Sequence, residues 1–389
     1  MRVLHSSDWH LGRSFGPVPL HDTQVAFAEW FVGLAVREQV DLVVIAGDVY
    51  DRAIPPTPSI ELFRSVLQRL RAAGVVVVVI AGNHDSAERV AAYDGLLDLS
   101  GVYVRGGYGR VGEVLTLHMP DGPVDVVLLP YLEPLLEPAS FHDEYEGDTD
   151  ARRRRPSHHE VLERAVQRAT AQLCSPRSIA VAHAFVTGSG VGPEQSESER
   201  QLVVGGTGEV SASLFEPFSY TALGHLHTPQ AVGGPTVRYS GTPLAYSFSE
   251  TTAKEVVLVE VDAHGTVEVA AVPVPVGRGV ATITGTIDDL LANPNAALVE
   301  HFVRVNLVDN TAVIDAKKRL QAQYPWVVEV NWQPAERADD ANRASVLERR
   351  QLTPIEAAGE YWRSLHDVDL TEAEHTVLAG VLEPAEGAR

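Results

Sequence analysis

The chain has 389 residues, of which 45% are hydrophobic, so it can bury a large core and is long enough for two or three folded units. Its 31 basic and 52 acidic residues give a formal net charge of -21, which excludes a uniformly basic nucleic-acid binder and leaves room only for a local basic surface. A single cysteine, Cys174, excludes a disulfide framework and a thiolate metal site. No segment has the roughly 18 apolar residues of a membrane span and no signal segment precedes the first apolar run, so we expect a cytoplasmic protein without membrane contacts.

The first hundred residues predict alternating strands and helices. Apolar runs predict strands at 2–7, 42–46 and 75–81, and helical spacing predicts helices at 22–39 and 59–73. Strands this apolar, separated by helices, are typical of a mainly parallel sheet buried on both faces. In such a sheet ligands gather at the carboxyl ends of the strands, and metal-seeking side chains follow these three strands at Asp8, Asp48 and Asn83.

Later segments continue this pattern. Strands are predicted at 124–129, 178–182 and 220–223, followed by a β-rich stretch that ends near Pro273. His183, His225 and His227 again follow strand ends, so we expect them to join the same site. The order of the elements predicts an α/β fold in which two sheets pack together as a sandwich flanked by helices.

The composition changes at 272–279, where prolines and glycines predict a linker. We therefore place a first domain at residues 1–275. A small α+β capping domain is expected at 280–334, with strands near 281–286, 301–308 and 327–332 and a helix at 312–323. A C-terminal helix pair is expected within 350–385, at 354–365 and 371–382, and Thr371 with Glu374 predicts a capping box at the start of the second helix.

The polar residues at the strand ends have the chemistry of a dinuclear metal site. Hydrolysis of a phosphate ester needs a nucleophilic hydroxide and neutralisation of phosphate charge, which two cations about 3.5–4 Å apart supply. Such a pair binds a bridging carboxylate, neutral imidazoles and carbonyl oxygens. The side chains of Asp8 and His10 lie on one side of an extended segment, and the segments GDVYDR, GNHD and GHLH together with His183 supply the other groups. Any one of these segments alone would be weak evidence, so the prediction rests on all five.

Two basic features are each open to two interpretations. Arg52 either binds a substrate phosphate or pairs with a neighbouring carboxylate. The run from Arg152 to Arg155 either neutralises the acidic stretch before it or contacts phosphate, and we favour the first interpretation.

Taken together, DWH, GDVYDR, GNHD, the isolated His183 and GHLH resemble the calcineurin-type metallophosphoesterase superfamily. The resemblance goes further, to the SbcD family of bacterial nuclease subunits, which are related to the Mre-type nucleases. It is carried by the opening MRVLHSSDWHLGRSF, by SESERQLVVGG at 196–206, and by YTALGHLHTPQ and RYSGTPLAYSFSE.

The resemblance implies a role for each site residue. One metal would be held by Asp8, His10, Asp48 and His227, and the other by Asp48, Asn83, His183 and His225, so that Asp48 bridges the two. His84 would protonate the departing sugar oxygen, and Asp51, or failing that Asp85, would orient its imidazole. Members of the family use manganese, whereas the ligand set alone suits Mn, Fe or Zn.

The resemblance also implies a substrate and partners. Family members are nuclease subunits of an ATP-regulated complex that acts on DNA ends, hairpins and single strands as exonuclease and endonuclease. They work with SbcC, an ATPase carrying a long coiled coil, whose base would dock on the C-terminal helices. The capping domain would contact DNA, and the subunit would be a homodimer within a heterotetramer.

Two other functions fit parts of the chain. The same fold hosts metallophosphodiesterases and phosphatases that act on small molecules or proteins, but these need neither a capping domain nor a docking helix pair after Pro273. A non-catalytic DNA-end tether would be expected to have lost ligands, and every ligand position is intact. The nuclease is therefore the favoured interpretation, and the phosphodiesterase or phosphatase is the alternative.

Overall fold

The computed structural model describes residues 1–138, 141, 156–188, 192–199, 208–334, 355, 359, 362–363 and 370–382. Contacts between residues divide the chain into two compact units. The first comprises Met1–Thr282, Asn295–Arg304 and Tyr324–Glu329, and the second comprises Ile283–Pro294, Val305–Gln323 and Val330–Arg389. The run from Arg152 to Arg155 lies outside the described residues.

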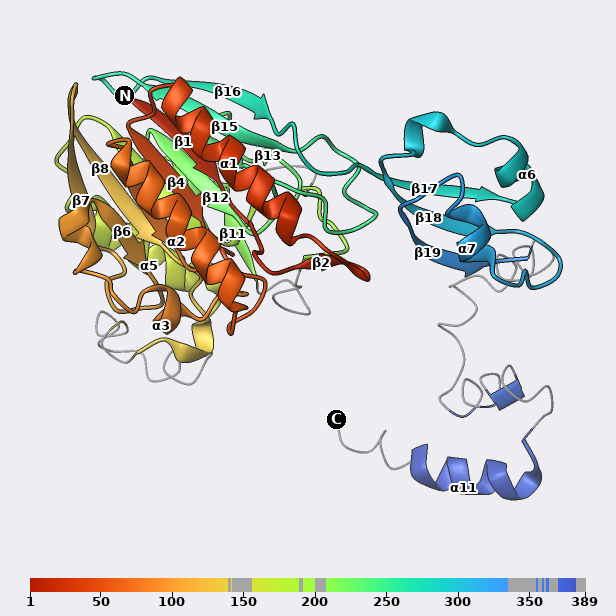
Figure 1. Ribbon diagram of the computed structural model, residues 1–389. Helices are drawn as coiled ribbons and strands as arrows, with labels where there is room; N and C mark the ends of the chain where they lie inside the picture. The colour runs from red at the N-terminus through yellow and green to blue at the C-terminus, as the bar shows by residue number, and fades with distance from the viewer. Residues whose placement is uncertain are drawn as a thin grey trace. The chain divides into compact units, whose positions relative to one another are not determined.

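Two six-stranded sheets form the framework of the first unit (Figure 1). The first sheet has the order β16 (Val267–Pro273), β15 (Glu255–Val261), β1 (Arg2–Ser6), β4 (Leu42–Ala46), β5 (Val76–Ile80) and β6 (Val102–Arg105). Its last four strands are parallel, and β15 and β16 run antiparallel to their neighbours.

The second sheet is also mainly parallel. Its order is β13 (Gln230–Ala231), β14 (Val237–Tyr239), β12 (Tyr220–Gly224), β9 (Ser178–His183), β8 (Gly122–Leu129) and β7 (Val114–Met119). The four central strands are parallel, and β13 and β7 pair antiparallel at the edges.

Side chains that alternate along the strands separate three hydrophobic layers. Val44 of β4 points into a buried cluster between the sheets that also contains Val181 of β9, whereas Val43 points to the opposite face, into the cluster that includes the buried residues of α1 (His21–Arg37) and α2 (Thr57–Ala72). On the outer face of the second sheet, Ala180 packs with Val161 of α5 (His158–Thr170). The predicted sandwich of two sheets flanked by helices is therefore confirmed.

The remaining elements of the first unit are short. Strands β2 (Ser14–Phe15) and β3 (Val18–Pro19) pair with each other, as do β10 (Phe185–Thr187) and β11 (Glu209–Ser211). Single turns of helix occur at α3 (Ala87–Val90), η1 (Leu97–Ser100), η2 (Pro134–Leu136), η4 (Ala212–Phe215) and η5 (Ala296–Leu298).

A third sheet follows the sandwich in the chain. Its order is β17 (Val280–Gly285), β18 (Phe302–Leu307) and β19 (Val327–Trp332), with α6 (Ile287–Ala292) and α7 (Ala316–Leu320) in the connections. The helix expected at 312–323 is shorter than predicted. Asp315 has a left-handed backbone with φ of 53°, which an α-helix does not accommodate, so the helix begins only after it.

The second predicted C-terminal helix is present as α11 (Glu372–Leu382). Its capping box is formed, since the Thr371 amide donates to the Glu374 carboxylate at 2.8 Å and the Glu374 amide donates to the Thr371 hydroxyl at 3.4 Å. Most of the first predicted helix, 354–365, lies outside the described residues. Within the part of the chain that the structure describes, no helix has the length and hydropathy needed to cross a membrane.

Candidate metal centre

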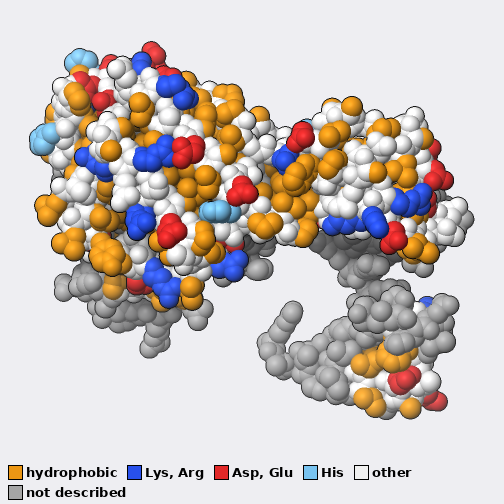
Figure 2. All heavy atoms as spheres, in the orientation of Figure 1, with side chains coloured by type: hydrophobic (Ala, Val, Ile, Leu, Met, Phe, Trp, Pro, Cys, Tyr) orange, Lys and Arg blue, Asp and Glu red, His pale blue; other side chains and the backbone are white. Residues whose placement is uncertain are grey.

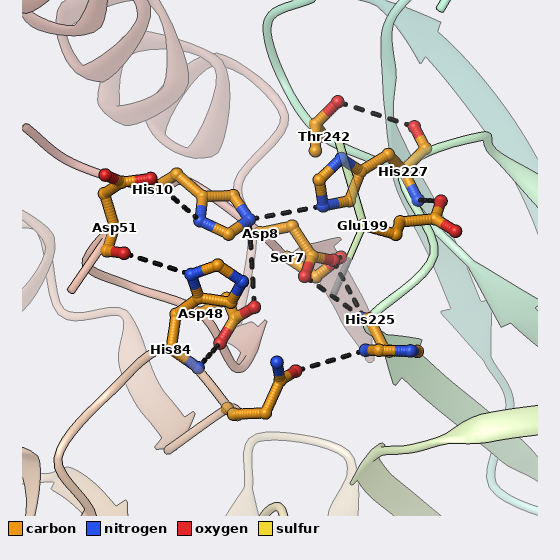
Figure 3. Close-up of polar contacts among 12 residues, drawn as sticks. Ser7, Asp8, His10, Asp48, Asp51, His84, Glu199, His225, His227 and Thr242 are labelled. Carbon is orange, nitrogen blue, oxygen red and sulfur yellow. Dashed lines mark hydrogen bonds and ion pairs between the residues drawn. The ribbon is translucent and has the colours of Figure 1, made fainter. Parts of the chain in front are cut away.

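The carboxyl ends of β1, β4, β5, β9 and β12, with the loops that follow them, converge at one edge of the sandwich and bring the predicted site residues together. Figure 3 shows Asp8, His10, Asp48, His84, His225 and His227 there. Main-chain hydrogen bonds join the first two loops. The Asp8 amide donates to the Gly47 carbonyl, and the His10 amide donates to the Asp48 carbonyl, both at 3.0 Å. The expectation that ligands gather at the carboxyl ends of parallel strands thus holds for both sheets.

Four predicted ligands have left-handed backbone conformations. The φ angles are 54° at Asp8, 43° at His10, 47° at Asp48 and 112° at His225. Such conformations cost about 1–3 kcal/mol each for residues other than glycine and persist only where the surrounding structure enforces them. They occur here because the chain must turn sharply after each buried strand to point a side chain into the site.

The ring of His183 lies between two glycines. A Cβ atom at Gly47 would collide with Nδ1 of His183, and a Cβ atom at Gly224 would collide with the Ala46 carbonyl and lie 2.9 Å from the same nitrogen. Gly47 also has a φ of 93°, which other residues rarely adopt. The glycines that precede Asp48 and His225 are therefore required by the close packing of main chain around His183.

Trp9 separates Asp8 from His10 and points the other way. It is buried in the hydrophobic cluster beneath α1, with its ring 5.1 Å from that of Phe27 and 5.2 Å from that of Phe31. Gln24 of α1 holds the same loop, since its amide nitrogen donates to the His10 carbonyl at 2.9 Å. Asp8 and His10 are therefore fixed on one side of the segment, but the segment is not extended as predicted, because both residues have left-handed backbones.

Three groups of side chains could each hold a cation. They are Asp8, His10 and His227; Asp8, Asp48 and His183; and His10, Asp48 and His84, and in each group the ligand atoms lie within 4.8 Å of one another. Oδ2 of Asp48 lies 3.7 Å from Nε2 of His10 and 3.6 Å from Nε2 of His183. One carboxylate oxygen thus lies between histidines of the two predicted metal positions.

Asn83 and His225 are the other predicted ligands of the second position, and they lie beside His183. Oδ1 of Asn83 lies 2.9 Å from Nε2 of His183 and 3.1 Å from Nδ1 of His225. The amide of His225 donates to both carboxylate oxygens of Asp8 at 3.1 Å, which links the β12 loop to the β1 loop.

Burial controls the protonation of these groups. It raises the pKa of Asp8 to about 8 and lowers the pKa of His227 to about 4, although the hydrogen bond to Glu250 opposes the second shift. Burial also holds the pKa values of His10 and His225 well below the ordinary histidine value. The imidazoles are therefore neutral at pH 7, which is the form that binds metals.

The donor set fits cations. The Ala46 carbonyl accepts a hydrogen bond from Nδ1 of His183 at 2.9 Å, so the lone pair on Nε2 faces Oδ1 of Asn83, which is also an acceptor. Acceptors that converge in this way are stabilised by a cation between them.

His84 contacts the main chain of Asp51. Its Nδ1 donates to the main-chain carbonyl of Asp51 at 3.0 Å, and its amide donates to Oδ1 of Asp48 at 2.8 Å. The Asp51 carboxylate instead lies 3.2 Å from Arg13 and 3.8 Å from Nδ1 of His10. Asp85 is also directed elsewhere, because its carboxylate accepts from the amides of Val49, Tyr50 and Gly82.

Arg52 is largely exposed, and its guanidinium lies 3.9 Å from the Asp51 carboxylate. This contact is the ion pair that was one of the two interpretations of Arg52. Exposed pairs of this kind contribute little stability, so the side chain remains able to reach a substrate phosphate.

Several groups behind the ligands were not predicted from the sequence. The Ser7 hydroxyl donates to Oδ2 of Asp8 at 2.5 Å, and Oε1 of Glu199 accepts from the His227 amide at 2.7 Å. Ser198 and Glu250 both contact Nδ1 of His227. The only signal was that Ser7 falls within the opening MRVLHSSDWHLGRSF and the other three within SESER and YSFSE, segments that carry the family resemblance without a chemical role assigned to these residues.

Comparison with known proteins identifies related sequences. A family model described as calcineurin-like phosphoesterase matches residues 1–229. The chain is 30% identical over 296 residues to the SbcD subunit of the nuclease SbcCD from Escherichia coli strain K12, and equally to that from E. coli O157:H7, with 75% of this chain and 73% of each relative covered. A solved structure described as the crystal structure of TT1561 of Thermus thermophilus has a TM-score of 0.38 and 14% identity, covering 69% of this chain and 98% of that one.

The fold, the convergent ligands and the family match make this chain a calcineurin-like metallophosphoesterase. Within that class it belongs to the SbcD family, whose E. coli members match it over most of their length.

Proposed function

We propose that this chain is the nuclease subunit of an SbcCD-type, ATP-regulated complex that hydrolyses phosphodiester bonds at DNA ends, in hairpins and in single strands. The observation that carries the two-metal chemistry is the position of Asp48, whose Oδ2 lies 3.7 Å from His10 and 3.6 Å from His183. Membership of the SbcD family supports DNA as the substrate.

The proposed ligands divide into two sets that share Asp48. Asp8, His10 and His227 would complete the first set, and Asn83, His183 and His225 the second. Two divalent cations bound there would supply a nucleophilic hydroxide and neutralise the non-bridging phosphate oxygens. Imidazole, carboxylate and amide ligands together suit manganese, the metal that the family resemblance implies.

His84 is the proposed general acid for the leaving sugar oxygen. Because the Asp51 carbonyl accepts from Nδ1, the ring is held with Nε2 directed away from that carbonyl. The ring of His84 packs edge-on against that of His10, with centroids 4.7 Å apart, and this contact with a proposed metal ligand supports the role. Asp51 thus acts through its main chain, and its carboxylate together with Arg13 and Arg52 forms a charged rim.

The alternative, a phosphodiesterase or phosphatase for small molecules or proteins, is not favoured. The family model ends at residue 229, and the chain continues with the β17–β18–β19 sheet and α11, elements that a small-substrate enzyme does not need. On the face drawn in Figure 2, basic and acidic side chains of the described residues are interspersed, so DNA binding would depend on local contacts rather than on a broad basic surface.

The same proposal includes partners. Residues 350–385 would dock on the base of the SbcC coiled coil, residues 280–334 would contact DNA, and the subunit would form a homodimer within a heterotetramer in the cytoplasm. Deleting the chain from residue 352 onward should release SbcC while preserving endonuclease activity. Unchanged co-purification of the truncated chain with SbcC would contradict the docking role.

The function is tested by incubating the protein with Mn²⁺ and either a hairpin or a blunt duplex, with and without SbcC and ATP. We expect cleavage of both substrates and stimulation of duplex cleavage by SbcC with ATP. A parallel reaction contains bis(p-nitrophenyl) phosphate. Hydrolysis of this small diester with no cleavage of either DNA would support the alternative instead.

A further inference from the structure

The segments SESER and YSFSE meet directly behind His227. Oγ of Ser198 lies 2.6 Å from Nδ1 of His227, and Oε1 of Glu250 lies 3.3 Å from the same nitrogen. Ser198 also donates to Oε1 of Glu250 at 2.5 Å. Two segments that have no place in the proposed hydrolysis thus form a chain of polar groups that ends on a metal ligand.

The direction of these hydrogen bonds fixes the tautomer of His227. An ionised carboxylate can accept hydrogen bonds but cannot donate them, so the Ser198 hydroxyl donates its proton to Glu250. The Ser198 oxygen is then left to accept a hydrogen bond from Nδ1 of His227. Nδ1 therefore carries the proton. The lone pair on Nε2 faces Nε2 of His10, 3.2 Å away, and these two histidines form a possible metal-binding group with Asp8.

Glu250 is held as a buried anion. Its side chain has no exposed surface, and Lys254 donates to Oε2 at 2.5 Å. The Thr242 hydroxyl at 3.0 Å and the Tyr246 amide at 3.2 Å donate to the same oxygen. Burying a carboxylate costs several kcal/mol unless it is paired in this way, so a merely structural residue at this position would not need to be charged.

The two metal positions differ in what lies behind their histidines. His227 is backed by an ionised carboxylate through Ser198, whereas His183 is backed by the neutral carbonyl of Ala46 at 2.9 Å. A carboxylate behind an imidazole raises its basicity and fixes its orientation, and loss of such a group costs about 10–100-fold in metal affinity.

We propose that Ser198 and Glu250 are positioning residues for His227. They raise the affinity of the site formed by Asp8, His10 and His227 for its metal above the affinity that the site would have without them. This inference rests on the metal centre of the proposed function. It assigns a specific task to the SESER and YSFSE segments.

The test is a titration with Mn²⁺ of full-length protein from which metal has been removed by a chelator. Binding is measured by calorimetry and by electron paramagnetic resonance. We expect wild type to bind two equivalents and to show a spin-coupled pair. Ser198→Ala and Glu250→Gln should each weaken the affinity for one Mn²⁺ equivalent by about 10–100-fold and change the affinity for the other by less than about threefold. Signals of isolated Mn²⁺ should therefore appear when about one equivalent has been added. Ser198→Thr keeps the hydroxyl and should restore the affinity.

Two matched controls separate positioning from general damage. Ser247→Ala removes a hydroxyl 3.4 Å from Oε1 of Glu250 that has no hydrogen bond to His227, and Asp125→Asn removes a buried carboxylate in β8. Both should bind two equivalents like wild type. Ser198→Ala leaves the Glu250 and Lys254 pair in place, so it remains informative if Glu250→Gln fails to fold.

The outcomes are distinct. Wild-type affinity for both equivalents in Ser198→Ala, or in folded Glu250→Gln, would overturn the positioning role while leaving the metal centre intact. Equal weakening of both equivalents would also overturn it, because the effect would then be general. A wild-type protein that binds no Mn²⁺ would refute the metal centre itself, and with it the proposed function.

Discussion

The main-chain carbonyl of Asp51 lies 3.0 Å from Nδ1 of His84, while the Asp51 carboxylate faces Arg13 at 3.2 Å. The residue that the family resemblance names as the orienting group therefore contacts the proposed acid, His84, through its main-chain carbonyl and not through its carboxylate. The main-chain carbonyl of Asp51 is retained when its side chain is replaced. The roles of His84 and Asp51 can consequently be separated by mutation.

Replacing His84 by Ala should abolish most cleavage while leaving the metals bound. General acid catalysis contributes about 10²–10⁴-fold, so we expect a loss of that order in the cleavage rate. Manganese content measured by mass spectrometry should equal that of wild type. Loss of a metal equivalent would instead make His84 a ligand, as its grouping with His10 and Asp48 also allows.

Replacing Asp51 by Asn should have a smaller effect than replacing His84. The carbonyl that accepts from His84 remains, and only the carboxylate contacts with Arg13, Arg52 and His10 are changed. We expect the single-turnover cleavage rate to fall less than about tenfold, well below the contribution of a general acid. A loss as large as that of His84→Ala would show that the carboxylate itself orients the acid.

Replacing Asp48 by Ala should remove the carboxylate that we propose to bridge the two metals. Oδ2 of Asp48 lies between His10 and His183, and Oδ1 accepts from the His84 amide, so both metals and the acid lose a contact. We expect at least one metal equivalent to be lost and cleavage to fall below detection. Full occupancy by two metals in the purified variant would exclude the bridging role.

Metal binding should stabilise the protein more at pH 8 than at pH 6. Burial raises the pKa of Asp8 to about 8, so the metal-free folded protein holds a proton there that the unfolded chain releases above about pH 4. Stability of the metal-free protein therefore falls as the pH rises toward 8, whereas Mn²⁺ binding requires the carboxylate and is favoured by the same rise.

The measurement is the increase in Tm on adding saturating Mn²⁺ to chelated protein at pH 6, 7 and 8. Asp8→Asn is the control, because its side chain keeps a carbonyl but has no proton to release, and its increase should depend less on pH. An increase in wild type that is constant or shrinks with pH would contradict the raised pKa of Asp8.

Asp125 should matter for stability alone. Its buried carboxylate accepts from the Thr116 hydroxyl at 2.7 Å and from the amides of Cys174 and Ser175 at 2.6 and 2.7 Å. Asparagine would place an NH₂ group against one of these donors, and we expect a loss of about 1–3 kcal/mol in the free energy of unfolding. Urea denaturation at pH 7 measures it, and an unchanged midpoint would show that the loop relaxes.

The sequence predicted the sandwich because its strands are unambiguous. Leu42–Ala46 is apolar throughout and is buried on both faces, so the predicted and observed bounds of β4 agree. At α7 the same reasoning failed, because the apolar spacing of 312–323 carries no sign that Asp315 adopts a left-handed backbone. Hydrophobic periodicity does not predict local backbone conformations that depend on tertiary contacts.

The convergence of the proposed ligands could be predicted from the sequence. Strand ends and spacing indicated Asp8, Asp48 and Asn83, because parallel strands bring their carboxyl ends to one edge. Ser198 and Glu250 lie 52 residues apart in sequence and are joined only by the folded chain. Which atom of Asp51 meets His84 likewise depends on loop geometry that residue types alone do not specify.

The left-handed backbones of Asp8, His10, Asp48 and His225 make the catalytic edge dependent on the rest of the molecule. Their conformational cost must be offset by packing around the loops, which are themselves buried: Trp9, Val49 and Leu226 each expose 1% or less of their surface. A substitution in the core directly beneath these loops, such as one at Trp9 or Leu226, should therefore lower metal occupancy before it unfolds the chain. In this protein metal content would act as an early indicator of core damage.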